Sequence, residues 1–178
     1  DQPKVLVIIH NNSSEAENVA AKVCKQLLEK RIEIFAPKED AKVLEKNGVK
    51  VEIFEANKGE SANLALVFGG DGTILRAVEV SRDKKIPILG INLGHVGFLA
   101  EAELEHLEDV VKSITEHSWI EEDRLALEVS VFKDNNKVFS TFALNDVAIE
   151  KSEPGHMFDV ILEDRKSTRL NSSHTDIS

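Results

Sequence analysis

The amino-acid sequence predicts an α/β fold: a parallel, doubly wound sheet in an N-terminal domain, followed by the start of an incomplete all-β domain. Short apolar runs alternate with amphipathic helical segments as far as residue 119. Strand-like segments then follow one another with no helical pattern between them. These observations predict an α/β domain at residues 1–119 and the beginning of a β-rich domain at residues 120–163.

The first strand and helix have clear patterns. Residues 5–9, Val-Leu-Val-Ile-Ile, are apolar at every position, which is typical of a parallel strand buried on both faces. Ser14 and Glu17 have the spacing of a capping box and predict the start of a helix. Its apolar stripe recurs at helical spacing: Val19, Ala20, Val23, Cys24, Leu27 and Leu28. We expect Cys24, the single cysteine, to be a core residue, so no internal disulfide or thiol cluster can form.

The rest of the α/β domain continues the alternation. Apolar runs predict strands, and amphipathic runs followed by helix-stop residues predict helices. The expected strands are residues 32–35, 49–54, 64–68 and 87–91, and the expected helices are residues 40–46, 73–81 and 103–116. This order of elements favours a parallel sheet.

The chain changes character after Trp119. Strand-like segments at residues 125–132, 137–150 and 158–163 are joined by turn residues, and the β-rich domain is incomplete where they end. Residues 164–178 are polar, lack periodicity and resemble a sequencing adapter translated in frame. We interpret them as an artefactual or disordered tail.

Composition excludes several classes of function. The formal net charge is −10, whereas nucleic acids and anionic membranes are bound through basic patches, so neither is an expected partner. Charged or polar residues interrupt every apolar run before it reaches the roughly 20 residues of a membrane span. The first residues lack a secretory pattern. We therefore expect a cytoplasmic protein, and the acidic charge leaves a small anionic ligand possible.

The chemistry is expected at residues 69–73, Gly-Gly-Asp-Gly-Thr, which directly follow the fully apolar strand at residues 64–68. A glycine turn between a parallel strand and a helix brings backbone N–H groups and a helix N-terminus around one anion site. Glycine permits positive φ and close approach of a ligand. Asp71 is unfavourable beside phosphate unless it accepts a proton or holds a cation. The alternative is an ordinary turn with Asp71 as the helix N-cap.

This turn resembles the signature of a kinase superfamily that includes NAD kinases, diacylglycerol and sphingosine kinases, and 6-phosphofructokinases. Two further segments, residues 90–99 and 143–147, resemble the second and third signature segments of NAD kinases. The similarity extends from Lys4 to Glu163 and looks closest to bacterial members, actinobacterial ones in particular. The resemblance implies a Rossmann-like N-terminal domain that binds nucleotide.

The resemblance also implies a reaction. NAD kinases transfer the ATP γ-phosphoryl group to the 2′-hydroxyl of the adenosine ribose of NAD and so form NADP. A divalent cation, normally Mg²⁺, is expected to arrive with ATP, and the sequence contains no pattern for a metal site made by protein alone. The partners are then NAD and ATP, or polyphosphate as donor, and the full-length protein is expected to be a homo-oligomer.

Residue roles follow where the motifs match. Asp71 is expected to be the catalytic proton acceptor, and the nucleotide site is expected to include Gly70, Asp71, Gly72, Arg76, Phe98, Asn145, Asp146 and His156. Arg76 could reach a phosphate or could be a solvated helix residue. Phe98 could face a base or simply pack. His156 stands eleven positions after Asn145, as a ligand-contacting histidine does in some members.

Two alternatives remain open: a lipid kinase of the same superfamily, or a nucleotide-binding module without catalysis. The acidic charge and the Asn145-Asp146 segment argue against the lipid kinase. In the family a Thr-Gly-Ser-Thr-Ala-Tyr-like loop completes the NAD site, and it does not follow Glu163 here. We therefore expect this chain by itself to bind NAD weakly and to have little or no kinase activity.

Overall fold

The structure is a computed structural model of the chain and describes residues 3–55, 59, 61–93, 102–103, 106–144, 161–164 and 167–169. The chain divides into two compact units, residues 1–122 and residues 123–178.

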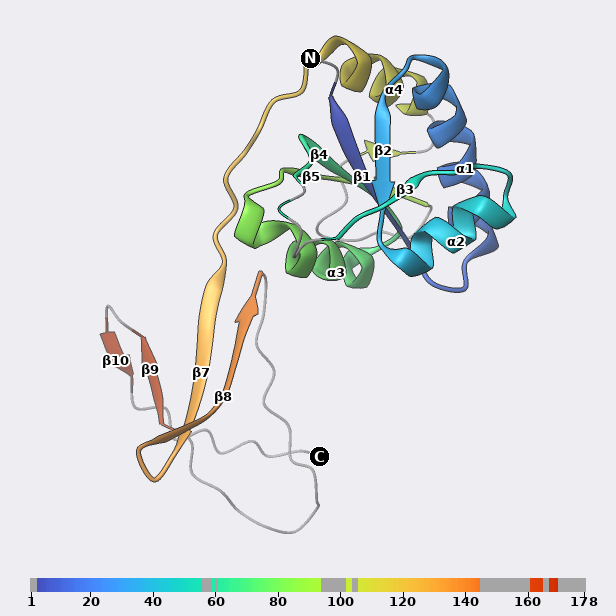
Figure 1. Cartoon of the computed structure of the whole chain (residues 1–178). Coiled ribbons are helices and arrows are strands. Elements are labelled where there is room, and N and C mark those ends of the chain that lie inside the picture. The colour runs from blue at the N-terminus through green and yellow to red at the C-terminus, as the bar shows by residue number, and fades with distance from the viewer. Residues whose placement is uncertain are drawn as a thin grey trace, which may run out of the picture. The chain divides into compact units, whose positions relative to one another are not determined.

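A parallel sheet organises the first unit. Among the described residues it has six strands in the order β3-β2-β1-β4-β5-β6, and every neighbouring pair is parallel (Figure 1). The strands are β1 (Lys4–Ile9), β2 (Glu33–Ala36), β3 (Glu52–Ile53), β4 (Leu64–Phe68), β5 (Ile88–Asn92) and β6 (Ala102–Glu103). The predicted α/β class with a parallel sheet is confirmed. Its strand order is that of the doubly wound nucleotide-binding fold.

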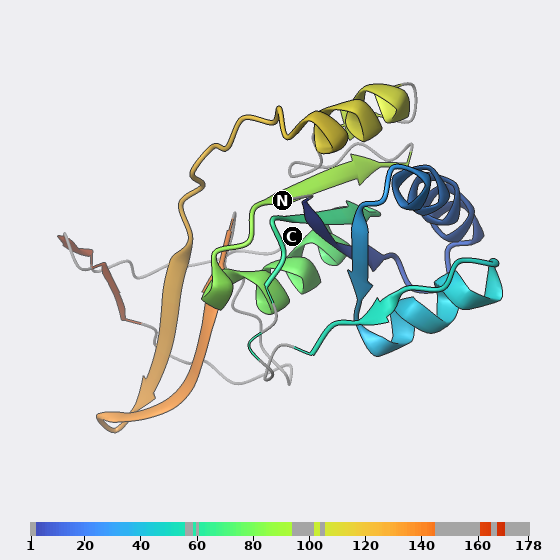
Figure 2. The same ribbon diagram turned by 45° about the horizontal axis from the view of Figure 1, so that its top comes forward.

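Helices cover both faces of this sheet. They are α1 (Ser14–Glu29), α2 (Lys38–Lys46), α3 (Asp71–Ser81) and α4 (Leu107–Glu116), and a 3₁₀ turn, η2 (Arg82–Lys84), continues α3. Residues of α1, α2 and α4 share one hydrophobic core, whereas α3 contributes to a second core on the opposite face (Figure 2).

The central strands β1 and β4 are apolar throughout because successive side chains enter opposite cores. Val5, Val7 and Ile9 pack in the core beneath α1, and Leu6 and Ile8 pack in the core beneath α3. In the same way the side chains of β4 alternate between the two cores. This explains why neither strand shows alternation of apolar and polar residues.

Cys24 lies in the larger core and is fully buried, as the helical stripe predicts. Burial raises the pKa of its thiol to about 12. A thiol that stays protonated is a poor nucleophile. Cys24 is therefore a packing residue.

Several element boundaries differ from the predictions. The N-cap of α1 is Ser13, whose hydroxyl accepts a hydrogen bond from the Ala16 N–H at 3.2 Å, so the predicted capping box is wrong. Leu28, expected in the buried stripe, is 38% exposed at the end of the helix. The strand expected at residues 49–54 is reduced to the two residues of β3, an edge strand with exposed side chains.

The second unit contains a hairpin of β7 (Leu127–Lys133) and β8 (Asn136–Ala143). Asp134 and Asn135 join the two strands with φ values of 49° and 63°, and positive φ at both central residues is characteristic of a type I′ hairpin turn. The turn expected at residues 134–136 is thus confirmed. A short antiparallel pair, β9 (Leu162–Asp164) and β10 (Ser167–Arg169), follows. The last residue of β9 and all of β10 fall within residues 164–178, the segment predicted to be an artefactual or disordered tail.

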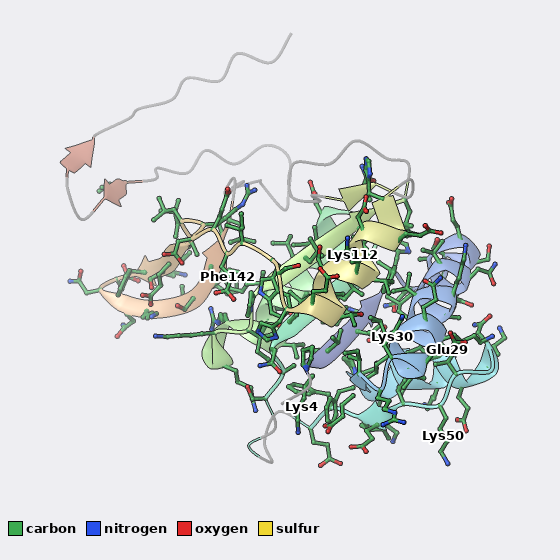
Figure 3. All side chains as sticks on the ribbon, turned by 90° about the horizontal axis from the view of Figure 1, so that it is seen from above. Lys4, Glu29, Lys30, Lys50, Lys112 and Phe142 are labelled. Carbon is green, nitrogen blue, oxygen red and sulfur yellow. The ribbon has the colours of Figure 1, made fainter. Side chains whose placement is uncertain are left out.

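Charged side chains surround the first unit. Glu29, Lys50 and Lys112 lie exposed on its outer surface (Figure 3). In the described part of the chain, no helix has the length and apolar character needed to cross a membrane.

Leu66 offers a test of this core, because it is fully buried on the central strand β4. Leu66→Ala should lower the free energy of unfolding by about 2–5 kcal/mol in urea denaturation. Leu28→Ala, the same change at an exposed position, should cost less than about 1 kcal/mol. Equal losses at the two positions would contradict the assignment of Leu66 to the core.

Candidate functional site

A cavity of about 430 Å³ opens at the carboxyl edge of the sheet. Its walls come from the segments that follow β1 and β4, the end of β5, and the first turns of α1 and α3. The lining residues are His10, Asn11, Ser13, Glu15, Gly69, Gly70, Asp71, Gly72, Thr73, Arg76, Asn92 and Leu93. The sequence predicted four of them, Gly70, Asp71, Gly72 and Arg76, as site residues.

The topology of the sheet creates this opening. Strand order runs from β1 outward through β2 and β3 in one direction and through β4 to β6 in the other, so β1 and β4 flank the switch point. In α/β sheets the crevice at that point is where ligands bind. Hydrogen bonds beyond the strands hold its walls: the His10 N–H donates to the Phe68 carbonyl at 2.8 Å, and the Gly69 N–H donates to the Ile91 carbonyl at 3.3 Å.

Gly69 is required by the fold itself. Its φ is +154°, and a β-carbon would lie 2.5 Å from Thr73 Oγ1 and 2.9 Å from the His10 β-carbon. A side chain at residue 69 would therefore push apart the segments after β1 and β4.

Gly70 and Gly72 are different. Of the three glycines of the turn, only Gly69 uses positive φ: Gly70 has φ −90° as the N-cap of α3, and Gly72 lies within the helix. A β-carbon at either position would meet nothing within 4 Å. Because both residues line the cavity, that open space is part of the cavity.

Asp71 is the first residue of α3 and is half-buried at the cavity wall. The alternative that it is the helix N-cap is wrong, because Gly70 has that role. The N-terminus of a helix favours negative charge, so it suits both this carboxylate and an anionic ligand.

Arg76 lies one turn further along α3, where its guanidinium makes three hydrogen bonds. Nη2 donates to the Ile9 carbonyl at 2.6 Å and to Asp40 Oδ1 at 2.8 Å. Nη1 donates to Asn11 Oδ1 at 3.0 Å. The alternative of a solvated helix arginine is wrong, because Arg76 ties α3 to α2 and to the end of β1.

Asp40 is a residue that the sequence analysis missed. Its side chain is 3% exposed, and Oδ1 accepts a hydrogen bond from the Ile9 N–H at 3.1 Å in addition to the bond from Arg76. Burial raises the pKa of this carboxyl, and the nearby Glu39 charge raises it further, whereas Arg76 and the Ile9 hydrogen bond act in the opposite direction. A signal was present in the sequence: Asp40 stands four residues before Leu44, on the buried face of α2.

The other predicted site residues, Phe98, Asn145, Asp146 and His156, lie outside the described residues. Within the described residues, no three histidine, cysteine, aspartate or glutamate side chains come together to hold a metal. Two carboxylates, Glu15 and Asp71, do line the cavity, and carboxylate oxygens suit Mg²⁺.

Comparison with known proteins identifies the family. A family model described as the ATP-NAD kinase N-terminal domain matches residues 5–119, which is more than half of the chain. The chain belongs to the NAD kinase family. The resemblance carried by the glycine turn and the two later segments is thus confirmed.

Individual relatives agree with the family. An NAD kinase of Thermobifida fusca is 36% identical over 168 residues, covering 89% of this chain and 52% of the relative. An NAD kinase of Corynebacterium diphtheriae is 46% identical over 105 residues, covering 58% of this chain and 33% of the relative. The chain therefore spans about half the length of the Thermobifida protein.

The crystal structure of yeast NADH kinase complexed with NADH matches with a TM-score of 0.68. The match covers 81% of this chain and 47% of the yeast chain at 18% sequence identity. It supports the shared fold of the family.

The two kinds of glycine can be separated by experiment. Gly69→Ala should lower the free energy of unfolding by about 1–3 kcal/mol, because of strain at positive φ and the contacts with Thr73 and His10. Gly72→Ala should leave it unchanged or raise it by up to about 1 kcal/mol, since alanine favours a helix. Urea denaturation measures both. A loss at residue 72 as large as that at residue 69 would show that the fold requires both glycines.

Asp40 should make stability depend on pH. The pKa of Asp40 is higher in the folded protein than in the unfolded chain. The stabilising contribution of Asp40 to the free energy of unfolding is therefore fully present below about pH 3.9, and it is lost as the pH rises through the folded pKa. Asp40→Asn cannot ionise. Its free energy of unfolding, measured in urea, should therefore rise relative to that of the unsubstituted chain between about pH 3 and about pH 7. A constant difference across this range would contradict the raised pKa.

Proposed function

We propose that this chain forms the front of an enzyme that transfers the γ-phosphoryl group of ATP to the 2′-hydroxyl of the adenosine ribose of NAD, forming NADP. The observation that carries the proposal is the joint placement of Gly70, Asp71 and Gly72 at the start of α3, on a cavity at the switch point of a sheet that belongs to this family. The cavity combines space for a ligand, a helix N-terminus and a carboxylate.

In this proposal Asp71 is the base. The ribose 2′-oxygen forms a bond to the γ-phosphorus, and its proton passes to the Asp71 carboxylate. The bond from the γ-phosphorus to the bridging oxygen breaks, and its electron pair leaves with ADP. Phosphoryl transfer depends mostly on positioning and charge stabilisation, so the backbone of the glycine turn and Arg76 share the work with Asp71.

A divalent cation, Mg²⁺, bound with ATP would neutralise charge on the phosphates, and phosphate oxygens and water would be its main ligands. Asp71 and Glu15 are the carboxylates on the cavity wall that could contact such a complex. Polyphosphate is a second donor of the same chemistry. We further propose that the whole protein is a cytoplasmic homo-oligomer whose NAD site also uses Phe98, Asn145, Asp146 and His156.

The domain assignment completes the proposal. Residues 1–119 form the nucleotide-binding domain, residues 120–163 begin the NAD-binding β domain, and residues 164–178 are an artefactual or disordered tail. The 178-residue chain alone should then bind NAD weakly and form little or no NADP.

The test of the function is NADP formation by the protein expressed from its complete gene, assayed with NAD, ATP and Mg²⁺. Asp71→Asn should lower turnover by about 10²-fold or more while NAD affinity stays within about threefold, because the amide keeps the shape but accepts no proton. The matched control is Asp109→Asn, which changes an acidic residue in the first turn of α4, outside the cavity lining. It should leave turnover unchanged.

Two results would decide against the proposal. Absence of NADP formation by the complete protein would remove the kinase function. Normal turnover of Asp71→Asn would remove Asp71 from the role of base, and its carboxylate would then be a helix-stabilising residue.

A further inference from the structure

The guanidinium of Arg76 has two differently placed ends. Nη2 is enclosed by the Ile9 carbonyl and by Asp40 Oδ1, and the same Asp40 oxygen accepts the Ile9 N–H. Arg76, Asp40 and the backbone of Ile9 therefore form a closed set of hydrogen bonds at the end of β1. This set fixes both the position and the plane of the guanidinium.

The partners of the two ends lie in different environments. Asp40 and Ile9 are buried, and neither lines the cavity. Asn11, the partner of Nη1, is exposed and lines the cavity together with Arg76, whose side chain is 31% exposed. Nη2 therefore faces the protein interior, and Nη1 stands at the cavity wall.

The pairing of Asp40 with Arg76 is not the strongest that these groups can form. A carboxylate and a guanidinium commonly make two parallel hydrogen bonds. Here Asp40 accepts from Arg76 through Oδ1, while its buried Oδ2 has no hydrogen-bond partner among the described residues. Leaving a buried acceptor unsatisfied costs stability. An ion pair that only stabilised the fold would be stronger if both Nη1 and Nη2 of Arg76 bonded to Asp40. The observed arrangement instead leaves Nη1 for a partner on the cavity side.

We infer that Asp40 is a positioning residue: it holds Nη2 so that Nη1 of Arg76 faces the cavity, where a phosphate oxygen of the ligand replaces the amide oxygen of Asn11. The inference rests on the proposed function in taking a phosphate-bearing nucleotide as the ligand. The orientation matters because two carboxylates, Glu15 and Asp71, line the same cavity. An arginine fixed toward the ligand offsets their repulsion, whereas a freely moving one could pair with either carboxylate.

The test compares ligands with and without phosphate on the protein expressed from its complete gene. Isothermal titration calorimetry would measure binding of NAD, inorganic pyrophosphate and adenosine. Arg76→Ala and Asp40→Ala should each weaken NAD and pyrophosphate binding at least tenfold, as expected for loss of one charge-assisted hydrogen bond. Adenosine binding should change by less than about twofold, because adenosine has no phosphate for Nη1 to contact.

The double variant identifies Asp40 as acting through Arg76. If it does, Asp40→Ala combined with Arg76→Ala should lose no more than about threefold beyond Arg76→Ala alone. If the losses of pyrophosphate affinity in the two single variants multiply in the double variant, the inference is overturned. Normal pyrophosphate affinity of Asp40→Ala would also overturn it.

Asp40→Asn keeps an oxygen for Arg76 and Ile9, so its pyrophosphate affinity should lie within about threefold of that of the unsubstituted protein. Glu39→Ala, an exposed neighbour in the same helical turn, is the control and should bind normally.

Two further variants test the cavity end. Asn11→Ala should leave pyrophosphate affinity unchanged or slightly higher, because the ligand no longer displaces a bond; a tenfold loss would make Asn11 a ligand contact and overturn its replacement by phosphate. Arg76→Lys keeps a charge for Asp40 but lacks the rigid planar guanidinium that presents one nitrogen to Asp40 and another to a ligand. The pyrophosphate affinity of Arg76→Lys should fall at least tenfold. Normal pyrophosphate affinity of this variant would overturn the inference even if Asp40→Ala failed to fold.

Failure of the inference can be distinguished from failure of the proposed function. If the complete protein binds pyrophosphate but forms no NADP, the proposed function fails while the Asp40 variants still test positioning. If the kinase is active and the losses of affinity caused by Asp40→Ala and Arg76→Ala multiply, the inference alone fails. If the unsubstituted complete protein binds neither NAD nor pyrophosphate, the inference is overturned.

Discussion

Parallel pairing of β1 with β4 is the constraint on which the site depends. Five residue pairs, from Val5 with Leu64 to Ile9 with Phe68, align the two strands so that they end together. Because helices cover both faces of the sheet, the side chains of these strands are buried in the two cores. Only the ends of the strands are then available to line a cavity. The segments after Ile9 and after Phe68 must therefore meet, and the switch in strand order leaves a cavity between them.

The three glycines of the turn differ in their surroundings: the fold requires glycine at residue 69, whereas Gly70 and Gly72 line the cavity. At residue 69 the backbone passes so close to His10 and Thr73 that no side chain fits. At residues 70 and 72 the surrounding space is open, and the conformation is accessible to other residues. A requirement for glycine at these two positions must then come from a molecule that approaches the backbone of α3 closely, as a phosphate group does at a helix N-terminus.

Patterns of apolar residues predicted the sheet and its main helices because burial on two faces leaves a direct trace in the sequence, as in residues 5–9 and 64–68. These patterns did not predict features that depend on one side-chain hydrogen bond. Ser13 and Ser14 are adjacent and chemically identical, and the choice of Ser13 as N-cap depends on the path of the chain after β1. Asp40 has no partner nearby in sequence, since Arg76 is 36 residues away and Ile9 is 31 residues away. Motif resemblance identified the glycine turn, but it could not reveal a supporting residue outside the motif.

An acidic chain is compatible with the proposed anionic ligand if a cation is fixed beside that ligand. The cavity lining contains two carboxylates, Glu15 and Asp71, together with the N-terminus of α3 and the guanidinium of Arg76. Net charge acts over long distances and is screened by salt, whereas a phosphate in the cavity responds to groups within a few ångströms. One guanidinium beside the ligand can therefore have more effect than distant surface charges, provided that a buried partner such as Asp40 fixes its direction.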